Sequence, residues 1–311
     1  MNGHGRRAPL PAVAAPDARV VVELASPIDL AATLWPVAHG SGDPTIRIGR
    51  DGAWRATRTP IGPATIRLVP AGTTISVRAW GDGAEWAVEH ARDLVGANDR
   101  PEELVPQHGV IAQLVRRLPG LRMPTTLRPF EALLPAICEQ KITGAEARRV
   151  LRVIVRAYGD PAPGPGSLLL PPDPAVLARE PYFAFHRLGL ERRRAELIRR
   201  CAELAPRLEG RSPDEVAAVL ARVPGIGPWT LAEVMRVAFG DPDAVSVGDY
   251  HIPNVVAWAL AGEPRADDAR MLALLEPYRG QRGRIQRLLE ASGLGPPRRG
   301  PRMPSRNIAA L

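Results

Sequence analysis

The segment that decides the fold of this chain is Val223-Pro-Gly-Ile-Gly-Pro-Trp-Thr230, which lies between two stretches with helical patterning. Gly225 and Gly227 carry no Cβ, so the backbone can form a tight hairpin there. Pro228 favours the first turn of the next helix, and free backbone N–H groups are expected at that N-terminus. Such a terminus binds phosphate without reading base sequence. An ordinary helix–helix turn is the alternative interpretation of this segment alone.

An aspartate follows the hairpin. Asp249 lies 22 residues after Gly227, beyond a predicted helix over Trp229–Phe239 and a loop over Gly240–Gly248. Because the loop must return the chain towards the hairpin, we expect the Asp249 carboxylate to lie near whatever the hairpin anchors. A cap for the helix that begins near Pro253 is the alternative role, and one residue can serve both.

The sequence is helical from about residue 100 onward. Thr143-Gly-Ala-Glu146 has the pattern of a capping box, and Ser212-Pro-Asp-Glu215 supplies an N-cap followed by a proline. Apolar residues recur with helical spacing after both. Further helices are expected over Arg194–Leu208, from Pro228, near Pro253, over Ala266–Leu275 and over Arg284–Ala291, with a loop over Pro161–Pro174.

The preceding part has β-type runs separated by Gly, Asp and Pro turns. The pattern predicts strands over Arg19–Leu24, Thr45–Gly49, Ala53–Thr59, Ala64–Val69 and Thr74–Trp80, and a short helix from Ser26 to Trp35. Alternating polar and apolar residues predict an antiparallel sheet with one apolar face. We expect a helix over Gly83–Val95 to cover that face through Trp86, Val88 and Leu94.

These patterns predict an α+β fold class, in which a small antiparallel sheet domain precedes an all-α domain. We expect a disordered leader over 1–17, the α+β domain over 18–98, the helical domain over 99–292 and a flexible basic tail over 293–311. No run of about 18 apolar residues lacks a charge, so no membrane span is expected. The segment after Arg7 is too weakly hydrophobic for a signal peptide.

Composition narrows the partners and cofactors. With 41 Lys and Arg against 33 Asp and Glu, the net charge of +8 modestly favours a polyanionic partner. Lys141 is the one lysine. The two cysteines, Cys138 and Cys201, exclude a disulfide framework and any four-cysteine zinc or iron–sulfur site, and both are expected in the core. A reducing, cytoplasmic compartment follows.

The hairpin and its aspartate together resemble the HhH-GPD superfamily of DNA glycosylases. Similar segments are Arg128-Pro-Phe-Glu-Ala-Leu133 with Ile137-Cys-Glu-Gln-Lys-Ile-Thr143, Leu188–Glu196, and Glu276-Pro-Tyr-Arg279. The order of sheet and helical domains resembles the AlkA type, that of 3-methyladenine DNA glycosylase II. The resemblance covers roughly residues 18–292.

The resemblance implies a monofunctional glycosylase of base excision repair, which hydrolyses the N-glycosidic bond of a flipped-out alkylated purine in double-stranded DNA and leaves an abasic site. Asp249 falls on the family's catalytic aspartate, which stabilises an oxocarbenium-like sugar and orients the attacking water. Trp229 stands where bifunctional relatives carry a Schiff-base lysine. No cofactor is implied. A monomer, associated with the nucleoid, is expected.

The resemblance also implies a base pocket and a DNA interface. Trp229, Tyr250 and Tyr278 match aromatic pocket positions, which suit cationic alkylated bases. Glu233 replaces an aromatic residue, and its carboxylate either pairs with a cationic base or points to solvent. DNA contacts are expected from Gln140, Lys141, Pro224, Gly225, Ile226, Gly227 and Thr230.

Lys141 follows Gln140 at the position of the wedge that fills the gap left by the flipped nucleotide, where AlkA has a leucine. Gln140 is then expected to contact the opposite strand. Lys141 contacts phosphates or a base edge in one interpretation and is simply solvated in the other. No metal is expected, with a monovalent cation at the hairpin carbonyls as a further possibility.

Two alternative functions remain. One is a non-catalytic helix–hairpin–helix DNA-binding protein, and the other is a glycosylase for deaminated or oxidised bases. A bare binding module has no need for Asp249 with Trp229, or for the Gln140 segment, because backbone anchoring requires no aspartate. The sequence leaves the range of lesions and the roles of the N-terminal domain and the tail open.

Overall fold

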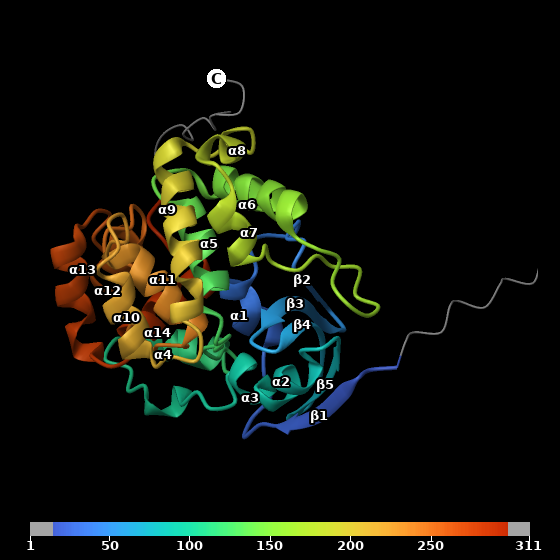
Figure 1. Cartoon of the computed structure of the whole chain (residues 1–311). Coiled ribbons are helices and arrows are strands. Elements are labelled where there is room, and N and C mark those ends of the chain that lie inside the picture. Colours follow the sequence, from blue (N-terminus) through green and yellow to red (C-terminus); the bar gives the residue numbers. More distant parts are fainter. Residues whose placement is uncertain (1–14, 298–311) are drawn as a thin grey trace, which may run out of the picture.

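The computed structural model describes residues 15–297 and has an α+β fold, in which a five-stranded antiparallel sheet packs beside a set of helices (Figure 1). The strands are β1 (Ala18–Glu23), β2 (Ile46–Gly49), β3 (Gly52–Thr59), β4 (Gly62–Ala71) and β5 (Thr74–Trp80), in the order β1-β5-β4-β3-β2. All five predicted strands are present, with ends within two residues of the prediction. Expectations for residues 1–14 and 298–311 lie outside the described residues.

One face of the sheet packs on α1 (Leu30–Leu34), α2 (Ala84–Glu89) and α3 (Ala91–Leu94). The helix predicted over 83–95 is interrupted at His90, and its buried residues are mainly alanines together with Leu94. Trp86 does not cover the sheet as predicted. Small side chains let α2 approach the strands closely, and the indole of Trp86 instead stacks on the ring of His90 at 4.1 Å between centroids.

The other face of the sheet is not left to solvent, so the prediction of a single covered face is wrong. The loop between α6 and α7 crosses it and places Leu168 and Leu170 against Ala56 in a separate small core. Trp54 and Trp80 stack on this face with ring centroids 5.5 Å apart. Apolar side chains of β3 therefore pack into a core on each face of the sheet, Ala53 on one and Ala56 on the other.

The remaining helices form two cores. The helices are α4 (Gly109–Arg117), α5 (Pro129–Glu139), α6 (Gly144–Tyr158), α7 (Pro174–Arg179), α8 (Tyr182–His186), α9 (Arg192–Leu204), α10 (Pro213–Leu220), α11 (Pro228–Ala238), α12 (Ile252–Ala261), α13 (Asp268–Leu275) and α14 (Arg282–Ser292), with 3-10 turns η1 (Trp35–Val37), η2 (Pro101–Glu103), η3 (Ala205–Arg207) and η4 (Glu276–Tyr278). Helices α5 to α11 surround one core, and α4 with α12 to α14 surround the other. Among the described residues, no helix is long and apolar enough to cross a bilayer.

Helix starts follow local side-chain chemistry. Ser212, the predicted N-cap, forms a capping box with Glu215, because each side chain accepts from the other residue's backbone N–H. Thr143 accepts from the backbone N–H of Glu146 and so caps α6. These caps explain why the predicted helix starts agree with the structure.

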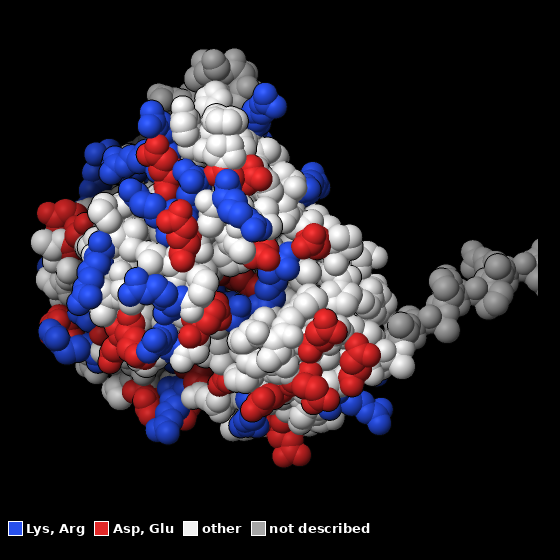
Figure 2. Space-filling view, viewed as in Figure 1, with Lys and Arg blue, Asp and Glu red and all other residues white. Residues whose placement is uncertain are grey.

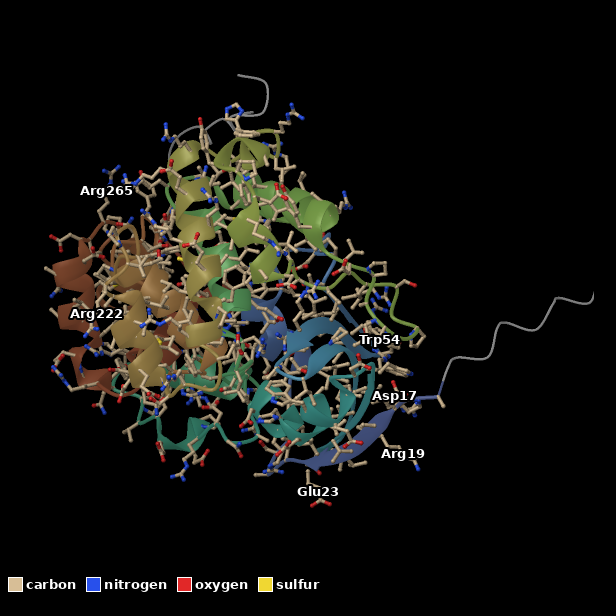
Figure 3. All side chains as sticks on the ribbon, viewed as in Figure 1. Asp17, Arg19, Glu23, Trp54, Arg222 and Arg265 are labelled. Carbon is tan, nitrogen blue, oxygen red and sulfur yellow. The ribbon has the colours of Figure 1, made fainter. Side chains whose placement is uncertain are left out.

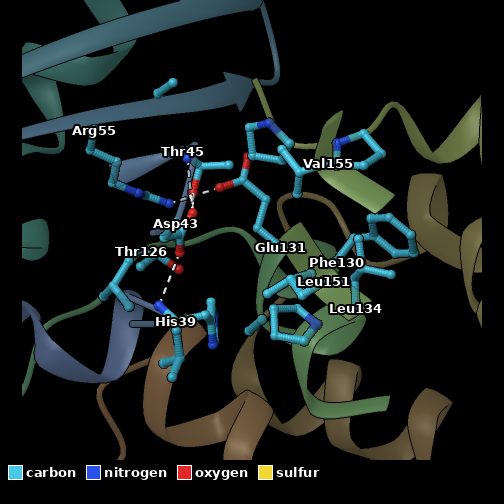
Figure 4. Close-up of a pocket in the computed structure, with 17 residues that line it drawn as sticks. His39, Asp43, Thr45, Arg55, Thr126, Phe130, Glu131, Leu134, Leu151 and Val155 are labelled. Carbon is cyan, nitrogen blue, oxygen red and sulfur yellow. Dashed lines mark hydrogen bonds and ion pairs between the residues drawn. The ribbon is translucent and has the colours of Figure 1, made fainter. Parts of the chain in front are cut away.

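A buried carboxylate ties the sheet to α5. Arg55 Nη2 donates to Glu131 Oε2 over 2.8 Å, as Figure 4 shows, and the Thr57 hydroxyl donates to the same carboxylate. The backbone N–H of Arg58 donates to Glu131 Oε1 over 2.8 Å. Burial lowers the pKa of Arg55, and Glu131 opposes that shift. Two segments far apart in sequence thus depend on one side chain for their contact.

We expect Glu131→Ala to lower the free energy of unfolding by about 3–5 kcal/mol, because it leaves the guanidinium of Arg55 buried without a partner. Chemical denaturation followed by circular dichroism measures the loss. The matched control is Glu196→Ala, which breaks an exposed pair with Arg192 and should cost about 0.5 kcal/mol or less. Equal losses in the two variants would contradict this role for Glu131.

Candidate active site

A cleft of about 850 Å³ lies between the sheet and both helical cores. Helix α11 contributes Trp229 and Glu233 to its wall, and the loop before α12 contributes Asp249. The N-terminal part forms the opposite wall and includes Trp35 and Arg47. The cleft therefore gathers the predicted catalytic aspartate and two predicted pocket residues in one place.

The carboxylate of Asp249 is held from two sides. Its Oδ1 accepts hydrogen bonds from the backbone N–H groups of His251 (2.6 Å) and Ile252 (2.9 Å), at the start of α12. Its Oδ2 accepts from Nε1 of Trp229 over 3.0 Å. Both roles considered for Asp249 are therefore compatible, since it caps a helix and also lines the cleft.

The hairpin before α11 has the backbone that its glycines predict. Gly225 has φ +104°, a left-handed value that disfavours other residues, whereas Gly227 is extended with φ −99°. A Cβ at Gly227 would meet no heavy atom within 4 Å, so the fold itself does not require glycine there. Within the described chain, the N–H groups of Gly225, Gly227 and Trp229 donate to no protein acceptor. The hairpin thus presents free donors at a helix N-terminus, which suits an anion.

The side chain of Gln140 contacts the hairpin, and its contact with the opposite DNA strand stays a prediction. Its Nε2 donates to the carbonyl of Gly225 (3.1 Å) and to the hydroxyl of Thr230 (2.9 Å). Thr230 is buried, so its side chain cannot contact DNA as expected. Lys141, the next residue, is exposed and has φ +56°. Gln140 therefore clamps the hairpin, and the turn that follows presents Lys141 to solvent.

The hairpin carbonyls already have donors. The carbonyl of Pro224 accepts from Nη2 of Arg200 over 3.0 Å, and that of Val223 accepts from the N–H of Ile226. A monovalent cation at these carbonyls stays a prediction. No group of three or more His, Cys, Asp or Glu in the described part of the chain could hold a metal ion.

Two predicted pocket tyrosines do not line the cleft. Tyr278 is buried in the C-terminal core, where its hydroxyl pairs with His108 Nδ1 at 2.7 Å. Its ring fills space between α4 and the last helices, so it is not available to a base. Tyr250 is 84% exposed and packs edge-on against His251. Neither residue is among those that line the cleft.

Sequence patterns missed an aromatic residue that does line the cleft. Trp35 in η1 is 63% exposed on the wall that the N-terminal part provides. An exposed tryptophan is uncommon, because its large ring is usually buried. Only the folded chain places it opposite α11, so no local motif could have identified it.

Glu233 sits among charged and polar side chains at the base of the cleft. Its Oε1 accepts from Arg236 Nη1 (3.0 Å) and from the Ser246 hydroxyl (2.5 Å). Arg236 also donates to Glu290 over 2.7 Å. Burial raises the pKa of Glu233, and Arg236 only partly offsets it. For Glu290, the charge of Arg236 and a bond from Gln286 outweigh burial and lower the pKa.

Both cysteines are buried, as predicted, and burial raises the pKa of Cys138 and Cys201 to about 12. Neither thiol ionises near neutral pH, so neither can serve as a nucleophile.

Charged side chains are unevenly distributed over the surface. Figure 2 shows basic residues interspersed with acidic ones over the helical part, whereas acidic residues gather beside α2 and β1. Arg222, next to the hairpin, projects from the helical part in Figure 3. On this face, the sheet part is therefore the more acidic of the two.

The sequence of the chain is similar to those of two kinds of curated protein. No protein-family model matches the chain. The chain is 26% identical over 211 residues to the probable bifunctional transcriptional activator/DNA repair enzyme AlkA of Mycobacterium tuberculosis, a match over 64% of this chain and 42% of that protein. It is 30% identical over 130 residues to DNA-3-methyladenine glycosylase 2 of Escherichia coli, over 40% of this chain and 45% of that protein. The matches thus span less than half the length of these curated relatives.

Solved structures share the fold over most of the chain. The 3-methyladenine DNA glycosylase of Archaeoglobus fulgidus has a TM-score of 0.75 and 20% identity, over 88% of this chain and 98% of that one. The 8-oxoguanine glycosylase/lyase of Clostridium acetobutylicum, in complex with double-stranded DNA, has a TM-score of 0.66 and 12% identity, over 88% and 97%. At these identities the likeness establishes the fold. The named relatives confirm the resemblance to DNA glycosylases of the AlkA type, and the shared fold agrees with it.

Proposed function

We propose that this protein is a monofunctional DNA glycosylase of base excision repair, which hydrolyses the N-glycosidic bond of a flipped-out alkylated purine and leaves an abasic site. One observation carries the proposal. The carboxylate of Asp249 lies in the cleft, bonded to Trp229 in the first turn of the helix whose N-terminus presents the free N–H groups of the hairpin. The free N–H groups of the hairpin and the Asp249 carboxylate therefore both lie at the N-terminal end of α11.

The chemistry follows from those two groups. The hairpin N–H groups bind backbone phosphate and set the register of the duplex. A base turned out of the stack enters the cleft beside the indole of Trp229, whose π face attracts a cationic ring. As the base departs, positive charge develops on the sugar, and the Asp249 carboxylate stabilises it. The same carboxylate orients or deprotonates the water that attacks the sugar.

The other expected properties belong to the same proposal. The domain over 18–98 forms one wall of the cleft, and the domain over 99–292 carries the hairpin and Asp249. The partner is double-stranded DNA, the protein acts as a monomer without a cofactor, and it associates with the nucleoid in the cytoplasm. DNA-3-methyladenine glycosylase 2 and AlkA among the relatives support an alkylated base.

A panel of duplexes, each with one lesion, tests the activity through base release. We expect release from duplexes with alkylated purines. Release only from deaminated or oxidised bases would favour the alternative glycosylase. Binding without release from any duplex would favour a non-catalytic binding protein.

We expect Asp249→Asn to lower the rate of base release by about 100-fold or more while leaving binding to lesion DNA intact. The amide oxygen can still accept from the first turn of α12, but the amide N–H₂ then faces the indole N–H of Trp229. Single-turnover kinetics and a binding titration separate the two effects. Asp241→Asn, in the same loop and outside the cleft, should keep wild-type kinetics, since its amide oxygen still accepts from Asp243. Wild-type turnover by Asp249→Asn would refute the catalytic assignment.

The two hairpin glycines should respond differently to alanine. At Gly227 the fold has room for a Cβ, so Gly227→Ala should fold normally and weaken binding to damaged and undamaged duplex alike, because the methyl group crowds the phosphate. Gly225→Ala should also destabilise the protein, since its φ is left-handed and its Cβ would lie 3.2 Å from Leu197. Melting curves and binding titrations distinguish the variants. A loss confined to one lesion would show instead that the turn contacts the base.

Borohydride should trap no covalent enzyme–DNA adduct. A Schiff base requires an amine, and the chain offers Lys141 and the N-terminal amine, while Trp229 occupies the start of α11. Damaged duplex should therefore yield an intact abasic strand that breaks only after alkali. Strand scission at neutral pH that disappears in Lys141→Ala would contradict this expectation.

A further inference from the structure

The base of the cleft is polar rather than aromatic. Five residues that line it, Glu233, Arg236, Ser246, Gln286 and Glu290, form one hydrogen-bonded network, which we call the polar floor. Three of them, Arg236, Ser246 and Gln286, are 5% exposed or less. The network brings together α11, the loop after it and α14, so it exists only in the folded chain.

Almost every polar atom of the polar floor has its partner within the network. Gln286 donates to the Ser246 hydroxyl and to Glu290 Oε1, both over 2.7 Å, and accepts from the Ser246 N–H over 3.0 Å. The Ser246 hydroxyl donates to Glu233 and accepts from Arg236. Arg236 Nε has no partner, but it is fully buried. Every other donor atom of the floor therefore already has an acceptor within the network.

The one acceptor that the floor leaves open is Oε2 of Glu233. Arg236 and Ser246 both donate to Oε1, and no described residue donates to Oε2. Two charge-assisted bonds to Oε1 hold the carboxylate in one orientation. Trp229 and Glu233 are one turn apart on α11, and both line the cleft. A base held beside the indole would therefore meet the Glu233 carboxylate as well.

We propose that Glu233 determines specificity by accepting a hydrogen bond from an exocyclic amino group of the flipped base. The proposal rests on the glycosylase function above and names the class of base that the cleft selects. An amino group satisfies Oε2, whereas a carbonyl oxygen or a ring C–H at the same place leaves it without a donor. The cleft therefore favours an alkylated base whose amino group reaches Oε2, adenine through C6 or guanine through C2, over alkylated hypoxanthine, which has an amino group at neither position.

Three N7-methylated lesions separate this effect from that of the methylated ring. Duplexes with 7-methyladenine, 7-methylguanine and 7-methylhypoxanthine share the N7-methylated imidazolium ring, and the third differs from adenine at C6 and from guanine at C2, where it lacks the exocyclic amino group. Base release is measured under single-turnover conditions, with an enzyme-free arm to subtract spontaneous depurination. The wild-type protein should release at least one amino-bearing base about tenfold faster than 7-methylhypoxanthine.

Glu233→Gln gives a directional test. Arg236 and Ser246 keep the amide oxygen at the Oε1 position, so the amide N–H₂ takes the place of Oε2. The favoured group then changes from a donor to an acceptor, and the preference for the amino-bearing base should fall at least tenfold or reverse. Glu139→Gln is the matched control, because Glu139 is another cleft carboxylate, paired with His39 at 3.6 Å, and should leave the ratio unchanged.

The outcomes distinguish failure of the proposed glycosylase function from failure of the specificity role of Glu233. If the wild-type protein releases no base from any duplex, including the wider lesion panel, the proposed glycosylase function fails. If it releases bases but Glu233→Gln leaves their ratio unchanged, or lowers all rates equally, the specificity role of Glu233 is overturned. A melting midpoint equal to that of the wild type establishes that Glu233→Gln is folded. If that variant is unfolded, Glu233→Asp takes its place, because the shorter side chain keeps a carboxylate but moves it away from the base. Glu233→Asp should lower the ratio of the rates without reversing it. An unchanged ratio would overturn the role of Glu233.

Discussion

The carboxylate of Asp249 joins the N-termini of two helices, and the geometry of the cleft depends on that junction. One of its oxygens binds the first turn of α12, which belongs to the C-terminal core. The other oxygen binds Trp229, in the first turn of α11. Because α11 packs in a different core, this side chain links the two helical cores. The pair between Arg236 of α11 and Glu290 of α14 links the same cores at the floor of the cleft.

The hairpin depends on a second constraint, which comes from outside its own sequence. Gln140, at the end of α5, holds both the Gly225 carbonyl and the Thr230 hydroxyl. The same helix end is capped by Arg194 of α9, whose guanidinium is buried and donates to the Cys138 carbonyl over 2.8 Å. A cation at a helix C-terminus is favourable, so α9 stabilises α5 there. The hairpin is thereby held on its protein side, while the N–H groups of Gly225, Gly227 and Trp229 find no acceptor in the described chain.

The polar floor and the N-terminal part give the cleft two different kinds of wall. Glu233 and its partners offer a fixed acceptor, whereas Trp35 across the cleft offers an exposed ring. The sheet holds its place partly through Glu131, which lies on α5, the same helix that ends at Gln140. A flipped base would meet stacking surface and hydrogen-bonding groups at once, which permits selection by edge as well as by charge.

Local rules were sufficient for much of this protein. Glycine and proline preferences, caps and apolar spacing correctly predict the strands, most helices and the hairpin before α11, because each depends on backbone dihedrals within a few residues. The place of Asp249 beside the hairpin was predicted instead from the loop that returns the chain after α11. Contacts between distant segments were beyond those rules. A tyrosine with the right motif spacing, Tyr278, is buried in a core, an unremarked tryptophan, Trp35, lines the cleft, and the side chain of Gln140 contacts the hairpin. Periodicity identifies an apolar or polar face, but what packs on that face depends on how the helices and the sheet come together, and only the tertiary structure decides that.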